Sequence, residues 1–167
     1  KESVEKLRDD GVENILIDFH AEATSEKRAM MMLLQGKVSA IVGGACSSET
    51  ASFVKTAMEK KIPVISYCSS APTLTGSGKY FFRNYVSDAY SGVYAAEYLN
   101  SVGAKKVAIV YPVTDWGTGL ESKFKSEFEK LGGTVVLSEG IKQDSKDFRT
   151  VLAKIKAQNP DYIFMAL

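Results

Sequence analysis

The sequence has few of the features that place a protein in a specialised class. Among its 167 residues are two cysteines and one histidine, and 21 Lys plus Arg nearly balance 20 Asp plus Glu. Two cysteines are too few for a disulfide scaffold or a zinc cluster. Balanced charge without a dense basic run gives no drive toward nucleic acid or an anionic membrane. We therefore predict no cofactor, no metal and no nucleic-acid partner.

Long apolar runs and a leader segment are also missing. No apolar run approaches the roughly 20 residues that span a bilayer. The opening KESVEKLRDD has neither the apolar region nor the cleavage site of a signal peptide. If the protein is exported, we expect its signal to have been removed or left out of this sequence.

Apolar runs alternate with segments of helical periodicity along the chain. The runs are ENILIDF, VSAIVGG, PVISY, YFFRN, KVAIVY, TVVLSEG and DYIFMAL. Between them lie amphipathic stretches such as TSEKRAMMMLLQG and the segment that places Leu120, Phe124 and Phe128 on one face. Continuous hydrophobicity in VSAIV, VAIVY and YIFMAL is typical of parallel strands covered on both faces. We predict an α/β fold with open, doubly wound parallel sheets.

Three tyrosines, Tyr90, Tyr94 and Tyr98, recur at every fourth residue of one predicted helix. This spacing puts them on one helix face, and we interpret them as helix-packing residues in preference to a stacking platform. The chain begins in helix-like sequence and ends on a buried-type strand, so we expect it to be the middle of a larger protein.

The stretch GGACSSET, at residues 43–50, could hold a phosphate, a nucleophile or a polar cradle. A Walker loop needs a lysine after its glycines, and a dinucleotide fold needs G-x-G-x-x-G; neither pattern is present. A hydrolase needs a base beside Ser47 or Cys46, and the sole histidine is His20, at a predicted strand end. A dyad with His20 stays a minor alternative.

Small polar residues follow three predicted strands, in ACSSET, CSSAPT and VTDWGT. Ligands of doubly wound sheets bind beyond the carboxyl ends of the strands, where helix starts present free amides. Free amides and a serine hydroxyl are hydrogen-bond donors, so they would suit a ligand that carries a carboxylate. The other interpretation is that Ser47, Ser70 and Asp115 only cap their own helices or turns.

The same stretches carry a family resemblance over essentially the whole chain. VSAIVGGACSSETA, IPVISYCSSAPTLT, FFRNYVSDAYSG, KKVAIVYPVTDWGTGL and FRTVLAKIKAQNPDYIFMAL follow one another as in the leucine/isoleucine/valine-type periplasmic binding proteins of ABC importers, which this chain resembles. The resemblance implies a type I clamshell of two flavodoxin-like lobes, only partly covered here, that closes on an amino acid or small carboxylate without catalysis. Residues 1–104 would form most of the first lobe, without its opening strand, and 105–167 the start of the second.

The resemblance also implies a location and a partner. The protein would be periplasmic or extracellular, with a lipid anchor as one option, and would act as a monomer that serves an ABC transporter permease. The same clamshell also serves as the sensing domain of receptors and regulators, which is the alternative function. A hydrolase on an α/β sheet is a third, weaker candidate.

Roles for first-lobe residues come with the resemblance. Ser47 would donate its hydroxyl to the ligand carboxylate, and Ser70 would contribute its hydroxyl and amide. The backbone carbonyl near Cys68 or Ser69 would accept from the ligand ammonium. Cys68 stands where the family has a small residue, so the pocket floor is altered. A bridge between Cys46 and Cys68 is geometrically open, but we favour free thiols.

Two further positions would lie beside the cleft. Asp88 falls where the family often has an acidic residue beside the cleft, and it could equally cap the helix that follows. Trp116, where many members have Tyr, would cover the ligand from the second lobe. The carboxylate that holds the ligand ammonium from that lobe would lie beyond Leu167.

Overall fold

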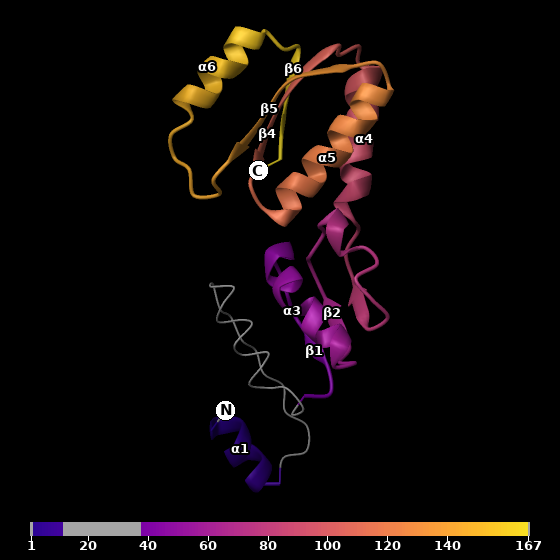
Figure 1. Cartoon of the computed structure of the whole chain (residues 1–167), viewed down its shortest axis with the longest axis vertical. Helices are drawn as coiled ribbons and strands as arrows, with labels where there is room; N and C mark the ends of the chain where they lie inside the picture. The colour runs from indigo at the N-terminus through magenta and orange to yellow at the C-terminus, as the bar shows by residue number, and fades with distance from the viewer. Residues whose placement is uncertain (1, 12–37, 167) are drawn as a thin grey trace.

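The computed structural model of the chain describes residues 2–11 and 38–166 (Figure 1). The elements are α1 (Glu2–Asp9), β1 (Ile41–Val42), α3 (Ser47–Glu59), β2 (Val64–Ser66), the 3-10 turn η1 (Pro72–Leu74), β3 (Phe81–Arg83), α4 (Asp88–Ser101), β4 (Lys106–Pro112), α5 (Asp115–Lys130), β5 (Thr134–Ile141), α6 (Arg149–Gln158) and β6 (Tyr162–Met165). The predicted strand ENILIDF, His20 and the predicted helix TSEKRAMMMLLQG lie outside the described residues.

The first block, residues 41–83, is built on a parallel sheet of short strands in the order β1-β2-β3. Its hydrophobic cluster joins α3 to the sheet through Phe53, Ala57, Ile62 and Val64. The short strands leave little apolar area, and loops supply much of the block. The strands predicted within VSAIVGG, PVISY and YFFRN are confirmed, each shorter than its apolar run.

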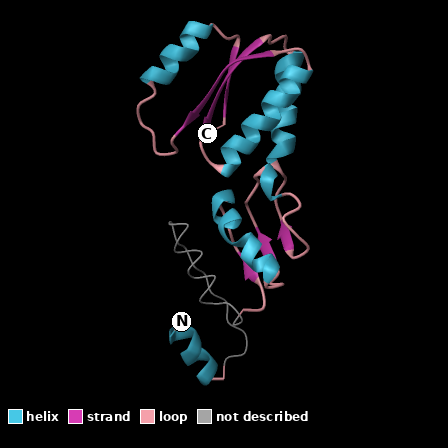
Figure 2. Ribbon diagram, in the orientation of Figure 1, coloured by secondary structure: helices cyan, strands magenta, loops and turns pink. Residues whose placement is uncertain are grey.

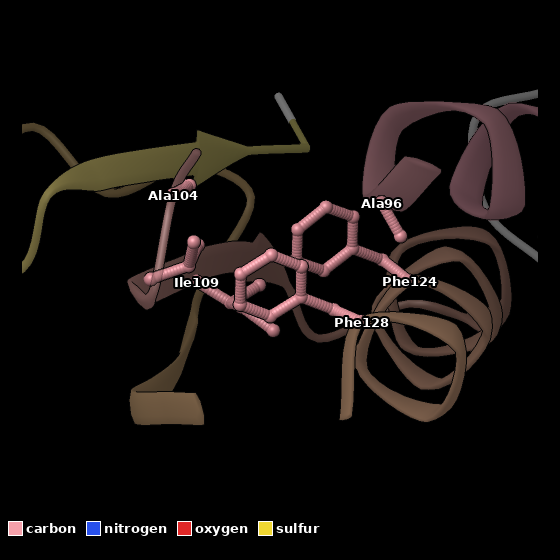
Figure 3. Packing of buried hydrophobic residues seen from close by; sticks show 6 residues of the cluster. Ala96, Ala104, Ile109, Phe124 and Phe128 are labelled. Carbon is pink, nitrogen blue, oxygen red and sulfur yellow. The ribbon is translucent and has the colours of Figure 1, made fainter. Parts of the chain in front are cut away.

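The second block, residues 88–165, has longer parallel strands in the order β5-β4-β6. Side chains of the central strand β4 alternate between two cores, as a strand covered on both faces requires. Val107 and Ile109 pack with Phe124 and Phe128 of α5 on one face (Figure 3). Ala108 and Val110 pack with Ile155 of α6 on the other. The predicted doubly wound α/β architecture is therefore confirmed.

Helix α4 packs with the second block. Figure 2 shows α4 beside α5, and at Gly92 the backbones approach so closely that an added Cβ would lie 3.0 Å from the Phe124 amide nitrogen. Ala96 belongs to the core of the second sheet. These residues fall within the range 1–104 that the resemblance assigns to the first lobe. The division into lobes stays a prediction, and this packing favours a boundary near residues 84–87.

The interpretation of the α4 tyrosines as packing residues is wrong. Tyr90, Tyr94 and Tyr98 are 73%, 73% and 60% exposed. The helix turns its smallest residues, Gly92 and Ala96, toward the core, because only small residues allow α4 to approach α5 so closely. None of the described helices combines the length and hydrophobicity needed to cross a membrane.

Candidate functional site

The candidate site begins where β1 ends and α3 starts. Gly44 has a φ of +84°, a left-handed conformation that favours glycine, and an added Cβ would lie 2.0 Å from the Thr50 hydroxyl oxygen. Cys46 is the N-cap of α3, and the Glu49 carboxylate accepts hydrogen bonds from the Cys46 and Ala45 amides. Ser47 is therefore the first helical residue, and the interpretation of Ser47 as the cap is wrong.

Ser47 is buried and makes one contact that links two loops. Its Oγ accepts a hydrogen bond of 3.0 Å from the Ala71 amide, in the segment that follows β2. Because the oxygen is the acceptor, the bond leaves the Ser47 hydroxyl hydrogen available to another acceptor. The helix-start amides of Ser47 and Ser48 have no carbonyl within α3 to bond. This corner thus offers donors to an anion.

A cluster of buried hydroxyl groups supports that corner. The Gly44 carbonyl accepts from Ser66 Oγ at 2.7 Å and from Ser69 Oγ at 2.8 Å. Ser69 Oγ also lies 2.7 Å from Thr50 Oγ1, and its amide donates to Ser66 Oγ. The Ser69 hydroxyl is fully buried and is used to hold the turn. Only its backbone carbonyl can serve a ligand.

Ser70 and Trp116 meet at the carboxylate of Asp88. Ser70 Oγ and Trp116 Nε1 each donate to Asp88 Oδ2, both at 2.5 Å, and the Asp88 amide donates to the Ser70 carbonyl at 2.9 Å. The other carboxylate oxygen, Oδ1, accepts from Ser91 Oγ at 2.8 Å. Ser87 is the N-cap of α4, so Asp88 does not have the capping role considered above.

Trp116 bridges the two blocks. It lies in the first turn of α5, is half-buried, and packs against a first-block cluster of Val54, Ala71 and Leu74. Thr114 caps α5 by accepting from the Gly117 amide, while Asp115 is exposed. The indole of Trp116 therefore packs across the boundary between the two blocks.

Cys68 and Cys46 are exposed free thiols, as favoured. Cys68 directly precedes the buried Ser69 and Ser70. No described hydrogen bond ends on the carbonyl of Cys68 or Ser69, whereas the Ser70 carbonyl is used by Asp88. These two carbonyls are thus available as hydrogen-bond acceptors.

Two cavities adjoin these residues. The larger, about 790 Å³, lies between the start of α3, η1 and the first half of α5, and its lining includes Ser48, Thr73, Asp115, Thr118 and Lys123. The smaller, about 190 Å³, is lined by Pro112, Thr114, Trp116, Ile141, Lys142, Gln143 and Phe148. Of the predicted site residues only Trp116 lines either cavity.

The cavity-lining residues missed from the sequence are mostly hydroxyl and loop residues. Thr118 and Ser122 stand one turn apart on α5, a spacing that marks a polar helix face but does not say what the face adjoins. Lys142 and Gln143 follow β5, at the same sheet edge as VTDWGT. Their position after a strand was the available signal.

A family model described as periplasmic binding protein matches residues 15–167. The chain belongs to this family.

Relatives of this periplasmic binding protein chain include binding proteins whose names state their ligands. It is 34% identical over 132 residues to an amino acid binding protein of Pseudomonas aeruginosa, covering 78% of this chain and 35% of the relative. It is 32% identical over 126 residues to the Leu/Ile/Val/Thr-binding protein of Salmonella typhimurium, covering 74% and 34%. The chain thus spans about a third of the length of these relatives.

Solved structures agree with the fold. A solute-binding protein of an ABC transporter from R. palustris, in complex with 4-hydroxybenzoate, superposes with a TM-score of 0.81 at 26% identity, covering 92% of this chain and 42% of that one. A leucine binding protein from Thermotoga maritima gives a TM-score of 0.78 at 25% identity, covering 98% and 49%. One sheet architecture therefore accommodates ligands as different as leucine and an aromatic acid.

Proposed function

We propose that the chain is the ligand-capturing part of an extracytoplasmic solute-binding protein, which holds an amino acid or similar small carboxylate between two lobes and delivers it to an ABC importer. Binding without turnover is the proposed activity, and a monomeric periplasmic or extracellular protein is the proposed form. The names of the relatives support the ligand class and the transport role. The chemistry at the start of α3 supports the binding mode.

The observation that carries the proposal is the state of the Ser47 hydroxyl. Its oxygen is fixed by the Ala71 amide, which leaves its hydrogen for an acceptor at the positive end of α3. A ligand carboxylate there would receive the hydroxyl and the free amides of the first helical turn. The site needs neither a metal nor a glycine-rich phosphate loop.

An ammonium group would have its own acceptors close by. The carbonyls of Cys68 and Ser69 receive no described hydrogen bond, and they lie in the loop that Ser47 contacts through Ala71. Hydrogen-bond donors for a carboxylate at the start of α3 and two carbonyl acceptors for an ammonium in the adjoining loop suit an α-amino acid. Ser70 would support this loop, and Trp116 would cover the ligand from the second block.

A thermal-shift screen of the full-length protein against amino acids and small carboxylates tests the proposal. A ligand at 100-fold its dissociation constant should add about 2.7 kcal/mol to the free energy of unfolding. If amino acids and carboxylates leave the melting temperature unchanged while other solutes raise it, the proposed ligand class is wrong.

Ser47→Ala then tests the binding mode. We expect the free energy of ligand binding to weaken by about 1 to 3 kcal/mol, because a charged acceptor loses a donor. Ser52→Ala is the matched control, since Ser52 lies on the same helix and its hydroxyl bonds only to the Glu49 carbonyl. Calorimetric affinities that are equal in the two variants would mean that Ser47 is structural.

A further inference from the structure

We propose that Asp88 is a positioning residue that orients Ser70 and Trp116 across the block boundary and does not itself bind the ligand ammonium. An acidic residue beside an amino-acid cleft would ordinarily be assigned to that ammonium. The contacts of Asp88 point to a different role, which deepens the proposed function.

The carboxylate of Asp88 is occupied by groups of the protein. Oδ2 accepts from both Ser70 Oγ and Trp116 Nε1, and Oδ1 accepts from Ser91 Oγ. A ligand ammonium would have to compete with these donors. The carbonyls of Cys68 and Ser69 receive no described bond and offer an ammonium acceptors without such competition.

The three segments joined by Asp88 explain what the residue does. Its amide and its carboxylate both bond Ser70, in the loop of the first block. The residue itself begins α4, directly after the segment that crosses between the blocks, and its carboxylate holds Trp116 at the start of α5. Rotation of one block against the other must therefore strain or break the bonds between Ser70 and Asp88.

Holding Trp116 matters because its indole contacts both blocks. The ring packs against Val54, Ala71 and Leu74 while its nitrogen is held by Asp88. The same ring lines the smaller cavity. Without the carboxylate, packing alone would fix the half-buried indole, and its N–H would lose its hydrogen-bond acceptor, which is unfavourable.

Two substitutions of Asp88 separate positioning from charge. Asp88→Asn keeps an oxygen for Ser70 and Trp116 and an amide for Ser91, so the positioning role should survive without the charge. Asp88→Ala removes every acceptor. In the ligand-free protein, Asp88→Ala should shift Trp116 emission to longer wavelength and increase its quenching by acrylamide, and Asp88→Asn should leave both close to the parent values.

Matched controls assign the signal and exclude general damage. Trp116 is the only tryptophan of this sequence, and Trp116→Phe identifies its share of the emission in the full-length protein. Ser91→Ala removes a bond to the same carboxylate within α4 and should leave the emission unchanged. Unchanged Trp116 emission in Asp88→Ala, with the protein folded by circular dichroism, would overturn the proposal.

A ligand pair supplies the second arm, which rests on the proposed function. L-Leucine and 4-methylpentanoate differ only in the ammonium group. We expect Asp88→Ala to weaken both by the same factor, about 10-fold if the displacement of Ser70 and Trp116 costs the ligand the equivalent of one hydrogen bond, and Asp88→Asn to weaken neither. Loss confined to leucine, and equal in the Asn and Ala variants, would show that Asp88 binds the ammonium. If the parent binds neither probe, leucine is not among its ligands, the thermal-shift screen still decides the ligand class, and the emission arm still decides the role of Asp88.

Discussion

The two blocks of the molecule are stabilised by different groups. Around the second sheet the core is aromatic and aliphatic, with Phe124 stacked on Phe128 and on Phe164 at centroid distances of 5.6 and 4.1 Å. The first block holds five of the six buried polar residues of the described chain: Ser47 and Thr50 in the first turn of α3, Ser66 at the end of β2, and Ser69 and Ser70 in the loop that follows.

The difference reflects what each region has to do. A hydrophobic core is non-directional and tolerates small movements, whereas a hydroxyl network fixes the positions of individual donors and acceptors. The network surrounds the corner at Ser47 that we propose for the carboxylate. The first block therefore buries hydrogen-bonded polar groups where the second block buries apolar side chains. The longer strands of the second block hold Trp116 in position.

Phe124→Ala should have the largest effect and tests the aromatic core. The ring is fully buried, and its removal should lower the free energy of unfolding by about 3 to 5 kcal/mol. Urea denaturation measures the loss. Phe82→Ala is the control, because that ring is 55% exposed in the first block. Equal losses in the two variants would contradict the contrast between the blocks.

Gly44→Ala should come next and tests the hydroxyl network. A Cβ at this position would clash with Thr50 Oγ1 while the backbone stays left-handed, which should cost about 2 to 4 kcal/mol. Gly76→Ala is the control, since Gly76 has a φ of +79° but no atom near its added Cβ. The difference in melting temperature between the two variants measures the effect of the clash alone. Equal melting temperatures would mean that the hydroxyl network around Thr50 rearranges at little cost.

A smaller effect is expected at Asp161, which lies at the start of the strands of the second sheet, away from the candidate site. The amides of Lys105 and Lys106 donate to Asp161, and these bonds, the Lys105 bond first, lower the pKa of its carboxyl. A lowered folded-state pKa gives stability that is present above the unfolded value of about 3.9 and is lost as pH falls through the folded value.

The pH dependence of the melting temperature tests the contribution of the Asp161 hydrogen bonds to stability. The parent should lose stability on acidification below about pH 4 more steeply than Asp161→Asn, which cannot titrate there. Asp144→Asn, on an exposed loop, controls for removing one negative charge. Parallel curves for the parent and Asp161→Asn would show that the two amide bonds give no pH-dependent stability.

Tyr94→Ser should have the smallest effect. Its ring is 73% exposed and lies opposite the packed face of α4, so the change should stay within about 0.5 kcal/mol. Ala96→Ser, on the buried face, should cost more because it places a hydroxyl in an apolar core. A loss at Tyr94 that equals or exceeds the loss at Ala96, by thermal melting, would restore the packing interpretation.

Much of the second block was predictable, and less of the candidate site was. Periodicity located β4, α5, β5, α6 and β6. The continuous apolar run of β4 fits a strand covered on both faces, whereas β6, predicted on the same ground, is mostly exposed in the described chain. Periodicity also put the α4 tyrosines on one face but could not say which face packs. The close approach at Gly92 decided that, since it requires small residues at the contact.

Among the site residues, the sequence located the loops but not the bonds. Position after a strand pointed to Ser47, Ser69 and Ser70 as a group. Only the tertiary structure distinguished Ser47, whose hydroxyl hydrogen is available to a ligand, from Ser69 and Ser70, whose hydroxyls donate to other groups of the protein. That distinction depends on contacts between residues 18 to 25 positions apart, which local sequence does not encode.

By itself the sequence determined the alternation of strands and helices, the polar character of the strand ends and the membership of a family, because these follow from local periodicity and residue type. The tertiary structure decided that α4 packs with the second sheet, that Asp88 gathers Ser70 and Trp116, and that the indole crosses between the blocks. Each of these depends on chain segments brought together only by folding, and a hydrogen bond forms or fails on differences of a few tenths of an ångström.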